Sequence, residues 1–218
     1  SSGDGLFVSH DGGATWERFA TPAETGTRCS GLIVDPTNPD IVHYTGSGYD
    51  RTLDGGQTWE TRLGGNCSGI VLDPQNPQRL MVGRQNDGIY RSLDGGSSWL
   101  KLTNGLPGSG MQRIVLAIAA SDPDVVYAAA STGGSVLGTW KTTDFGNSWT
   151  QLANTPSFAS PQAWYDMYLA VDPTDADRVY AGGVSPIYAV AGILRSTNGG
   201  QSWVEISAGL NGNSAQTH

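Results

Sequence analysis

Three carboxylates stand in segments of the chain that also carry aromatic and amide side chains: Asp50, Asp87 and Asp166. Two carboxyl groups that face one cleft can hydrolyse a glycosidic bond, at a separation of about 5–5.5 Å in retaining enzymes and about 6.5–9.5 Å in inverting ones. Sequence alone does not provide these separations. The three residues are therefore candidates for a catalytic acid and base, without an assigned role.

The same segments carry side chains suited to holding a sugar or a protein partner. Aromatic rings offer large flat contact surfaces, and guanidinium and amide groups hydrogen-bond hydroxyl oxygens. The candidate ligand-binding residues are Arg28, Tyr49, Arg84, Asn86, Arg113, Trp164, Tyr165 and Tyr188. For Trp164 and Tyr188, simple packing of a long loop is the alternative.

A repeated octapeptide organises the elements that must position these residues. Its copies are SHDGGATW (9–16), TLDGGQTW (52–59), SLDGGSSW (92–99), TTDFGNSW (142–149) and STNGGQSW (196–203). Successive tryptophans are 43, 40, 50 and 54 residues apart. In the best-formed unit, CSGIVLDP, RLMVGRQ, GIYRS and WLKLT read as four short strands separated by turns. No helical periodicity competes, so each unit is predicted to be a four-stranded antiparallel sheet.

The motif Ser/Thr-x-Asp-x-Gly-x-Ser/Thr-Trp resembles the Asp-box, or BNR repeat, of sialidases, two-propeller xyloglucanases, sortilin-type receptors and a photosystem assembly factor. We therefore expect an all-β fold, a β-propeller of about 4.5 four-stranded blades. Residues 1–218 are predicted to be a single domain. Its units are a half-blade at 5–19 and full blades at 29–63, 67–103, 111–153 and 164–207.

The ring is expected to be incomplete. Residues 5–19 supply two outer strands, and the tail AGLNGNSAQTH after the last unit has no strand pattern. An open sheet edge invites pairing with other strands. We expect a larger ring of six to eight blades that continues beyond His218, closed by the remainder of the propeller or by another chain. The alternative is a five-bladed ring closed by an irregular tail.

The motif itself is interpreted as structural. Its carboxylates can accept hydrogen bonds from turn amides, its second glycine suits a left-handed backbone, and its tryptophan can bury a large ring. In the last copy Asn198 keeps the acceptor oxygen and drops the charge, which a turn tolerates and catalysis rarely does. The structural set is Asp11, Trp16, Asp54, Trp59, Asp94, Trp99, Asp144, Trp149, Asn198 and Trp203, with Gly13, Gly56, Gly96, Gly146 and Gly200.

Loop lengths point to the other end of the blades as the working face. The loops between first and second strands are uniform, as in DPTNPD and DPQNPQ, and should share an end with the motif turns. Loops at the opposite end vary, from RQNDG to GVSPIYAVAG and ANTPSFASPQAWY. Binding residues concentrate in variable loops on a rigid scaffold. We therefore expect a glycan or protein ligand at the variable-loop end.

Asp50 is the least expected residue at that end. Aligning third strands places it where other units have Phe7, Tyr90, Trp140 and Leu194, an apolar position between blades. A carboxylate there is costly unless it is paired, and Arg84 or Arg28 could pair with it. The alternatives are a catalytic group with a raised pKa or a small shift of register.

Composition excludes several classes. The net charge of −8 and pI of about 4.6 argue against nucleic acid and anionic membranes, and no apolar run is long enough for membrane insertion. The histidines are isolated, so no metal site and no cofactor are predicted, although calcium among loop oxygens stays an alternative. Cys29 and Cys67 occupy equivalent places in successive repeats, and a bridge between them or two free thiols are both open.

Two functions of different class remain. The first is a secreted or cell-envelope scaffold that displays loops for a glycan or protein partner. The alternative is a xyloglucanase-like or sialidase-like glycoside hydrolase whose cleft is completed outside this chain. The resemblance to xyloglucanases fails at one loop. That family has a carboxylate in a loop of the type Arg-Thr-Asp-Ile-Gly-Gly, whereas the corresponding loops here, YTGSGYD and GRQNDG, have Thr45 and Gln85 in its place. No Arg-Ile-Pro signature accompanies the arginines, so the scaffold is favoured.

Overall fold

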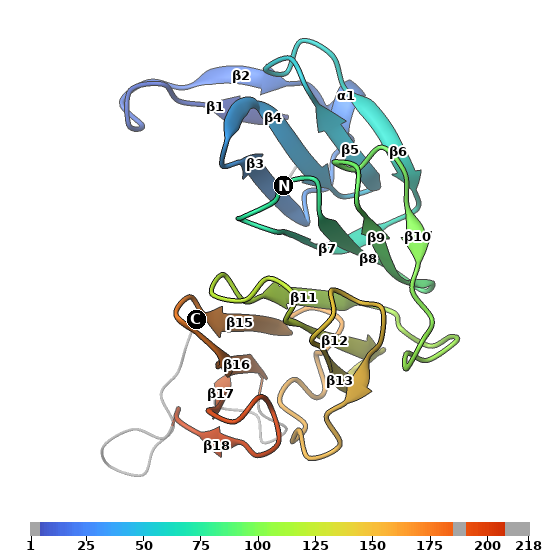
Figure 1. Ribbon diagram of the computed structural model, residues 1–218. Coiled ribbons are helices and arrows are strands. Elements are labelled where there is room, and N and C mark those ends of the chain that lie inside the picture. Colours follow the sequence, from blue (N-terminus) through green and yellow to red (C-terminus); the bar gives the residue numbers. More distant parts are fainter. Residues whose placement is uncertain (1–4, 185–190, 208–218) are drawn as a thin grey trace.

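The computed structural model describes residues 5–184 and 191–207, which form five antiparallel sheets (Figure 1). The half-blade consists of β1 (Leu6–Val8) and β2 (Glu17–Ala20). The first blade contains β3 (Gly31–Asp35), β4 (Asn38–Thr45), β5 (Gly48–Thr52) and β6 (Glu60–Gly64). The second blade contains β7 (Cys67–Leu72), β8 (Leu80–Arg84), β9 (Gly88–Ser92) and β10 (Leu100–Lys101).

The third and fourth blades repeat this order. The third contains β11 (Ile114–Ile118), β12 (Val126–Thr132), β13 (Ser135–Thr142) and β14 (Thr150–Gln151). The fourth contains β15 (Tyr168–Asp172), β16 (Asp175–Val184), β17 (Ala191–Ser196) and β18 (Val204–Glu205). In every full blade each strand pairs with its sequence neighbour. The expected all-β propeller of four-stranded blades is confirmed, and the only helix among the described residues is α1 (Pro22–Thr25).

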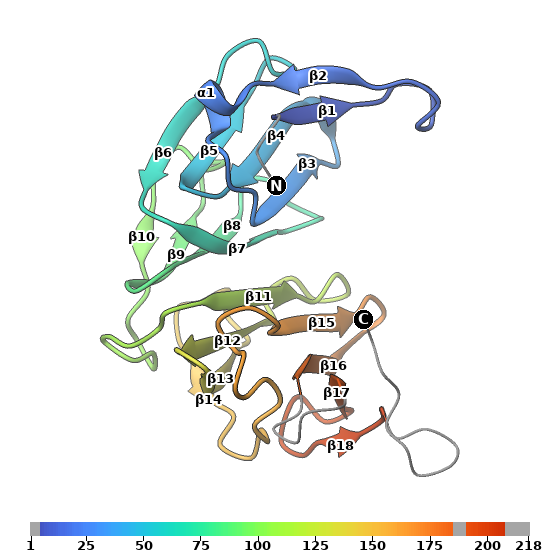
Figure 2. The ribbon, with the colours of Figure 1, turned by 180° about the vertical axis from the view of Figure 1, so that it is seen from behind.

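The blades stack side by side around the first strands. β3 lies against β7, β7 against β11, and β11 against β15. Figures 1 and 2 show the first and second blades together on one side and the third and fourth on the other, with the half-blade beside the first. The stack is held by an apolar core between the second and third blades that includes Met81, Ile89, Ile114 and Trp140.

Burial on both faces explains why second strands read as continuous apolar runs. In β8 the residues from Leu80 to Val82 are fully buried, and in β12 those from Val126 to Ala130 are as well. Each of these strands is covered by a blade on either side, so alternation with polar residues disappears. The run of alanines in β12 leaves room for larger neighbours such as Trp140, which stands opposite Ala128.

No helix in the described part of the chain has the length and apolar character needed to cross a membrane.

Candidate functional site

The motif turns and the hairpins between first and second strands lie at one end of each blade. Backbone amides in the turns donate to hairpin carbonyls: Gly55 to Asp40, Gly95 to Gln78, Phe145 to Asp124, and Gly199 to Asp177, all at 2.9–3.0 Å. The variable loops therefore occupy the opposite end. There, loops between second and third strands contact the segments between blades, as in the hydrogen bond from Ala163 N to Gly134 O at 3.1 Å.

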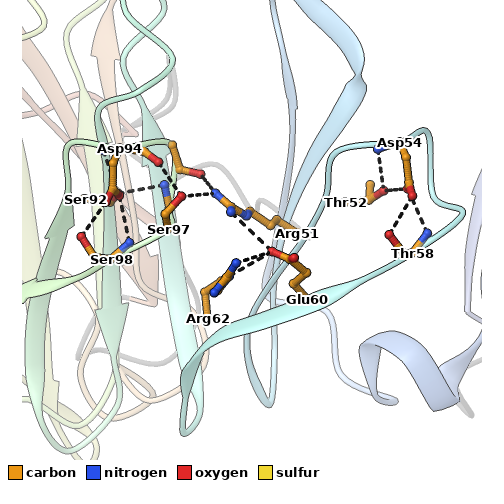
Figure 3. A network of polar contacts seen from close by, with 12 residues as sticks. Arg51, Thr52, Asp54, Thr58, Glu60, Arg62, Ser92, Asp94, Ser97 and Ser98 are labelled. Carbon is orange, nitrogen blue, oxygen red and sulfur yellow. Dashed lines mark hydrogen bonds and ion pairs between the residues drawn. The ribbon is translucent and has the colours of Figure 1, made fainter.

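Each motif carboxylate is engaged within its own turn, as Figure 3 shows for Asp54 and Asp94. The Oδ1 atom of Asp94 accepts from the Ser92 hydroxyl at 2.8 Å and the Ser98 amide at 2.9 Å, and Oδ2 accepts from the Ser98 hydroxyl at 2.6 Å. The bond from the Ser98 hydroxyl is the largest cause that lowers the pKa of Asp94 to about 2. Asp54 and Asp144 make the same three contacts. These oxygens are committed to the turn.

The fourth-blade copy reproduces the turn without a charge. Asn198 Oδ1 accepts from the Ser202 amide at 3.0 Å, and its Nδ2 donates to the Ser202 hydroxyl at 2.8 Å. The second glycines take left-handed backbone angles, with φ between 81° and 94° from Gly13 to Gly200. The position before them is also left-handed, and Phe145 occupies it in one copy with φ of 48°.

The motif tryptophans pack toward the preceding unit, with one exception. Trp59 meets Phe19 edge-on at 5.8 Å between centroids, and Trp99 meets Tyr49 at 4.7 Å. Trp16, in contrast, is 64% exposed. The expectation of a buried ring is wrong for Trp16 because no described blade lies before the half-blade to cover it.

At the variable-loop end, Asp87 is the hub of an ion cluster. It accepts from Arg84 Nη1 at 2.6 Å, from the Tyr90 hydroxyl at 2.7 Å, and from Lys101. The hydrogen bond from Lys101, followed by that from Tyr90, lowers the pKa of Asp87. Its neighbour Asn86 is left-handed, with φ of 61°, and its amide donates to Met111 O at 2.9 Å. Asp87 is thus held as a carboxylate.

Asp50 occupies the aligned position but lacks the predicted arginine partner. It pairs with Tyr44 across β4 and β5, as Tyr90 pairs with Val82 in the second blade, which excludes a shift of register. The pairing with Arg84 is wrong, because that guanidinium binds Asp87, and no ion pair joins Asp50 to Arg28 among the described residues. The 5% exposed carboxyl accepts from the Thr61 hydroxyl, and burial raises its pKa.

The prediction that Tyr49 binds a ligand is wrong. Its side chain is fully buried, packs on Trp99 and has its hydroxyl 2.7 Å from His43 Nδ1. The strand alternation turns it into the interface between the first and second blades, away from the loop end. Arg28 is exposed, and its carbonyl accepts from the Tyr44 hydroxyl at 2.5 Å. Tyr188 lies outside the described residues.

An exposed aromatic pair stands in the segment before β15. Trp164 and Tyr165 are 59% and 64% exposed, with ring centroids 5.5 Å apart and planes at 46°. Arg113, just before β11, donates from Nη1 to the carbonyls of both residues. Burial lowers the pKa of Arg113, and the nearby Asp166 opposes that shift. The guanidinium fixes the backbone that presents the two rings.

Lys101, Tyr90 and Thr61 are partners of the candidate carboxylates that sequence reasoning missed. Lys101 and Thr61 stand on fourth strands opposite Tyr90 and Asp50. Pairing third with fourth strands in the repeat alignment would have found them. The cysteines are both free thiols, Cys29 exposed and Cys67 buried, so the alternative of a bridge is wrong. The described residues contain no group of three or more side chains placed to hold a metal ion.

Comparison with known proteins agrees with this architecture. The BNR/Asp-box repeat model matches residues 7–18. The chain is 27% identical over 214 residues to a xyloglucanase of Paenibacillus sp, covering 94% of this chain and 18% of that protein. It is 26% identical to xyloglucanase Xgh74A of Acetivibrio thermocellus, covering 94% of this chain and 23% of the relative. The chain thus spans about a fifth of these relatives.

Solved structures show the same fold. An ancestral GH74 enzyme superposes with a TM-score of 0.73 at 20% identity, over 98% of this chain and 30% of the enzyme. The GH74 enzyme of Niastella koreensis gives 0.71 at 22% identity, over 91% and 33% of the two chains. The fold and the repeated motif define an Asp-box β-propeller. Within that class, the Paenibacillus and Acetivibrio relatives are glycoside hydrolases of the xyloglucanase type.

Proposed function

We propose that this chain is part of a β-propeller glycoside hydrolase that acts on xyloglucan, and that its blades bind the polysaccharide. The observation that carries the proposal is the similarity to xyloglucanases along 94% of the chain. This similarity supports the hydrolase hypothesis better than the display scaffold that the sequence favoured. Because the chain spans only about a fifth of those relatives, the activity belongs to the whole protein.

The aromatic pair is proposed as a subsite for the glycan. Trp164 and Tyr165 present two neighbouring rings at the variable-loop end, and Arg113 holds their backbone. Flat rings bind the CH faces of sugars at a small cost in conformational entropy, because few torsions are immobilised. Asp166 directly follows the pair, and its Oδ2 atom is buried without a donor among the described residues.

The carboxylates of these blades are proposed to serve binding rather than catalysis. Asp87 has three cationic or hydroxyl donors and a lowered pKa, which suits neither a general acid nor a free nucleophile. Asp50 has the raised pKa of an acid but is 5% exposed. This observation also favours the second candidate, a binding propeller without hydrolysis. In the hydrolase, the catalytic pair would be supplied by residues outside this chain.

Partner strands are proposed for the half-blade. A cavity of about 600 Å³ lies beside it, and its apolar lining includes Phe7, Phe19, Leu32 and Val34. Where the full blades have four strands, this sheet has two among the described residues. Two strands from the remainder of the protein or from another chain would cover that surface. Because xyloglucan is a large polymer, we expect an extracellular or cell-envelope location.

The test is a comparison of two tryptophan variants in the full-length protein. Trp164→Ala should raise the KM for xyloglucan about tenfold and leave kcat unchanged, as expected when only ground-state binding is lost. Trp16→Ala is the matched control, because Trp16 is equally exposed but lies at the motif end. Binding of xyloglucan without release of reducing ends would support the scaffold. Equal kinetics for Trp164→Ala and wild type would refute the subsite.

A further inference from the structure

A half-open cavity of about 270 Å³ lies between the first and second blades at the motif end, opposite the proposed xyloglucan subsite. We name it the inter-blade slot. Its polar lining includes Asp35, His43, Arg51 and Asp94, and its apolar lining consists of Ile41, Leu53 and Pro77. Figure 3 shows Arg51 reaching from the first blade toward the motif turn of the second. The volume far exceeds the roughly 10–15 Å³ that a single water needs.

Two buried donors in this lining have no protein acceptor among the described residues. Arg51, 5% exposed, donates from Nη1 to Gly95 O at 2.5 Å and Ser97 Oγ at 3.0 Å, and from Nη2 to Glu60 at 3.4 Å. Its Nε atom has no partner within the described part of the chain. Buried donors are rarely left unpaired, because desolvation then goes uncompensated. The equivalent Arg91 of the second blade also has an Nε without a described partner, so this feature is shared by both blades and the slot is distinguished by its second donor.

His43 contributes the second donor. It stands directly opposite Arg51 on neighbouring strands, so both side chains lie on the same face of the sheet. The buried Tyr49 hydroxyl is 2.7 Å from His43 Nδ1. We assign Nδ1 as the acceptor of that hydroxyl, which places the ring proton on Nε2. The Nε2 atom is buried and has no partner among the described residues.

The corresponding space is filled at the two later interfaces, between the second and third blades and between the third and fourth. Between the second and third blades, Phe145 takes the motif position of Gly95, is 3% exposed and lies 3.9 Å beneath the Arg79 guanidinium. Between the third and fourth, Tyr127 takes the strand position of His43 and donates from its hydroxyl to Ala176 O at 2.9 Å. The slot therefore exists because Gly95 and His43 are smaller than Phe145 and Tyr127 at the equivalent positions. Stacking of the blades alone does not create it.

The lining favours a neutral ligand. An anion would meet Asp35 and Asp94, while the one guanidinium is already paired with Glu60. Burial lowers the pKa of His43 to about 4, so it adds no charge at neutral pH. The described residues contain no cluster of side chains that could hold a metal ion. Asp35 Oδ1 is saturated by Thr37 and the Asn38 amide, whereas Oδ2 takes no hydrogen bond from a described residue and can accept from a hydroxyl.

We propose that the inter-blade slot binds a neutral pyranose sugar. Hydroxyl oxygens of the sugar accept from His43 Nε2 and Arg51 Nε, a hydroxyl donates to Asp35, and the CH face lies on Leu53 and Pro77. The site is separate from the Trp164–Tyr165 subsite and does not depend on the proposed hydrolase activity.

The test uses full-length protein with isotope-labelled histidine and three probes, D-xylose, D-glucose and D-galactose. At least one sugar should shift the His43 Nε2–H resonance in a saturable manner. Gly95→Phe should weaken that binding about tenfold or more by filling the slot. The ring should be accommodated, because Phe145 adopts the same left-handed backbone and the nearest atoms to a Cβ on Gly95 belong to the flexible Gln78 side chain. Gly12→Phe is the matched control at the same motif position in the half-blade, where the space is open.

His43→Met provides a second variant, since Met81 holds the same strand position in the second blade. By calorimetry it should lose affinity for the sugar about tenfold. The proposal is overturned if no sugar gives a saturable shift, if Gly95→Phe binds as wild type does, or if acetate or inorganic phosphate produces the shift instead. Because the readout is binding at His43, such a failure is distinct from a failure of xyloglucan hydrolysis.

Discussion

Replacing a motif carboxylate should affect stability through the hydrogen bonds that the carboxylate accepts. Asp94→Ala removes the bonds from Ser92 and Ser98 described above. Each contributes about 0.5–1.5 kcal/mol net, and the turn is exposed, so water replaces part of the loss. We expect destabilisation by about 1–2 kcal/mol, or a fall in Tm of about 2–8 °C for a chain of this size.

Asp94→Asn is the matched variant, because Asn198 already forms the same turn in the fourth blade. Its Tm at pH 7 should lie between those of Asp94→Ala and wild type, because Asn keeps the acceptor oxygen of the turn but lacks the charge. The pKa of Asp94 is lowered to about 2 from 3.8, so its charge-dependent stabilisation is present above about pH 4 and is lost as the pH falls toward 2. Thermal unfolding measured across that range should show a larger loss in wild type than in Asp94→Asn, which keeps the lowered pKa values of Asp11, Asp54 and Asp144. A stable Asp94→Asn protein without xyloglucan activity would refute the structural role.

Three further predictions concern buried groups. Asp50→Asn should be at least as stable as wild type at neutral pH and should lose that advantage below about pH 4. Burial raises the pKa of Asp50, so ionisation of this carboxyl lowers the stability of wild type as the pH rises. A variant that is less stable than wild type in urea unfolding at neutral pH would contradict this. Arg113→Lys should destabilise the 164–165 segment by about 1–2 kcal/mol, seen as faster amide hydrogen exchange there and not in β11. Iodoacetamide should alkylate Cys29 and spare buried Cys67, whose pKa burial raises to about 11; equal modification of both in the native protein would disagree.

The fold was predictable because the five copies of the repeat can be compared with one another. Five copies of one turn reveal which positions are structural, and Asn198 in place of an aspartate separates hydrogen bonding from charge. The alignment that placed Asp50 among Tyr90, Trp140 and Leu194 agrees with the observed register. Loop lengths also distinguished the two ends of the blades correctly, because hairpin and motif turns are joined by backbone hydrogen bonds.

The side-chain environment was less predictable. Tyr49 follows a loop in sequence, yet strand alternation turns it into a blade interface. Arg84 binds Asp87, three residues away, in preference to Asp50, and Lys101 joins them from a fourth strand, outside the variable loops. The inter-blade slot depends on Gly95 standing where another copy has Phe145, and that difference has meaning only once the blades are stacked.

The most direct test of the account is a structure of the full-length protein with a bound xyloglucan oligosaccharide. Sugar rings are expected against Trp164 and Tyr165 at the variable-loop end. A xyloglucan chain held by Asp54, Asp94 or Asp144 in the motif turns would contradict it.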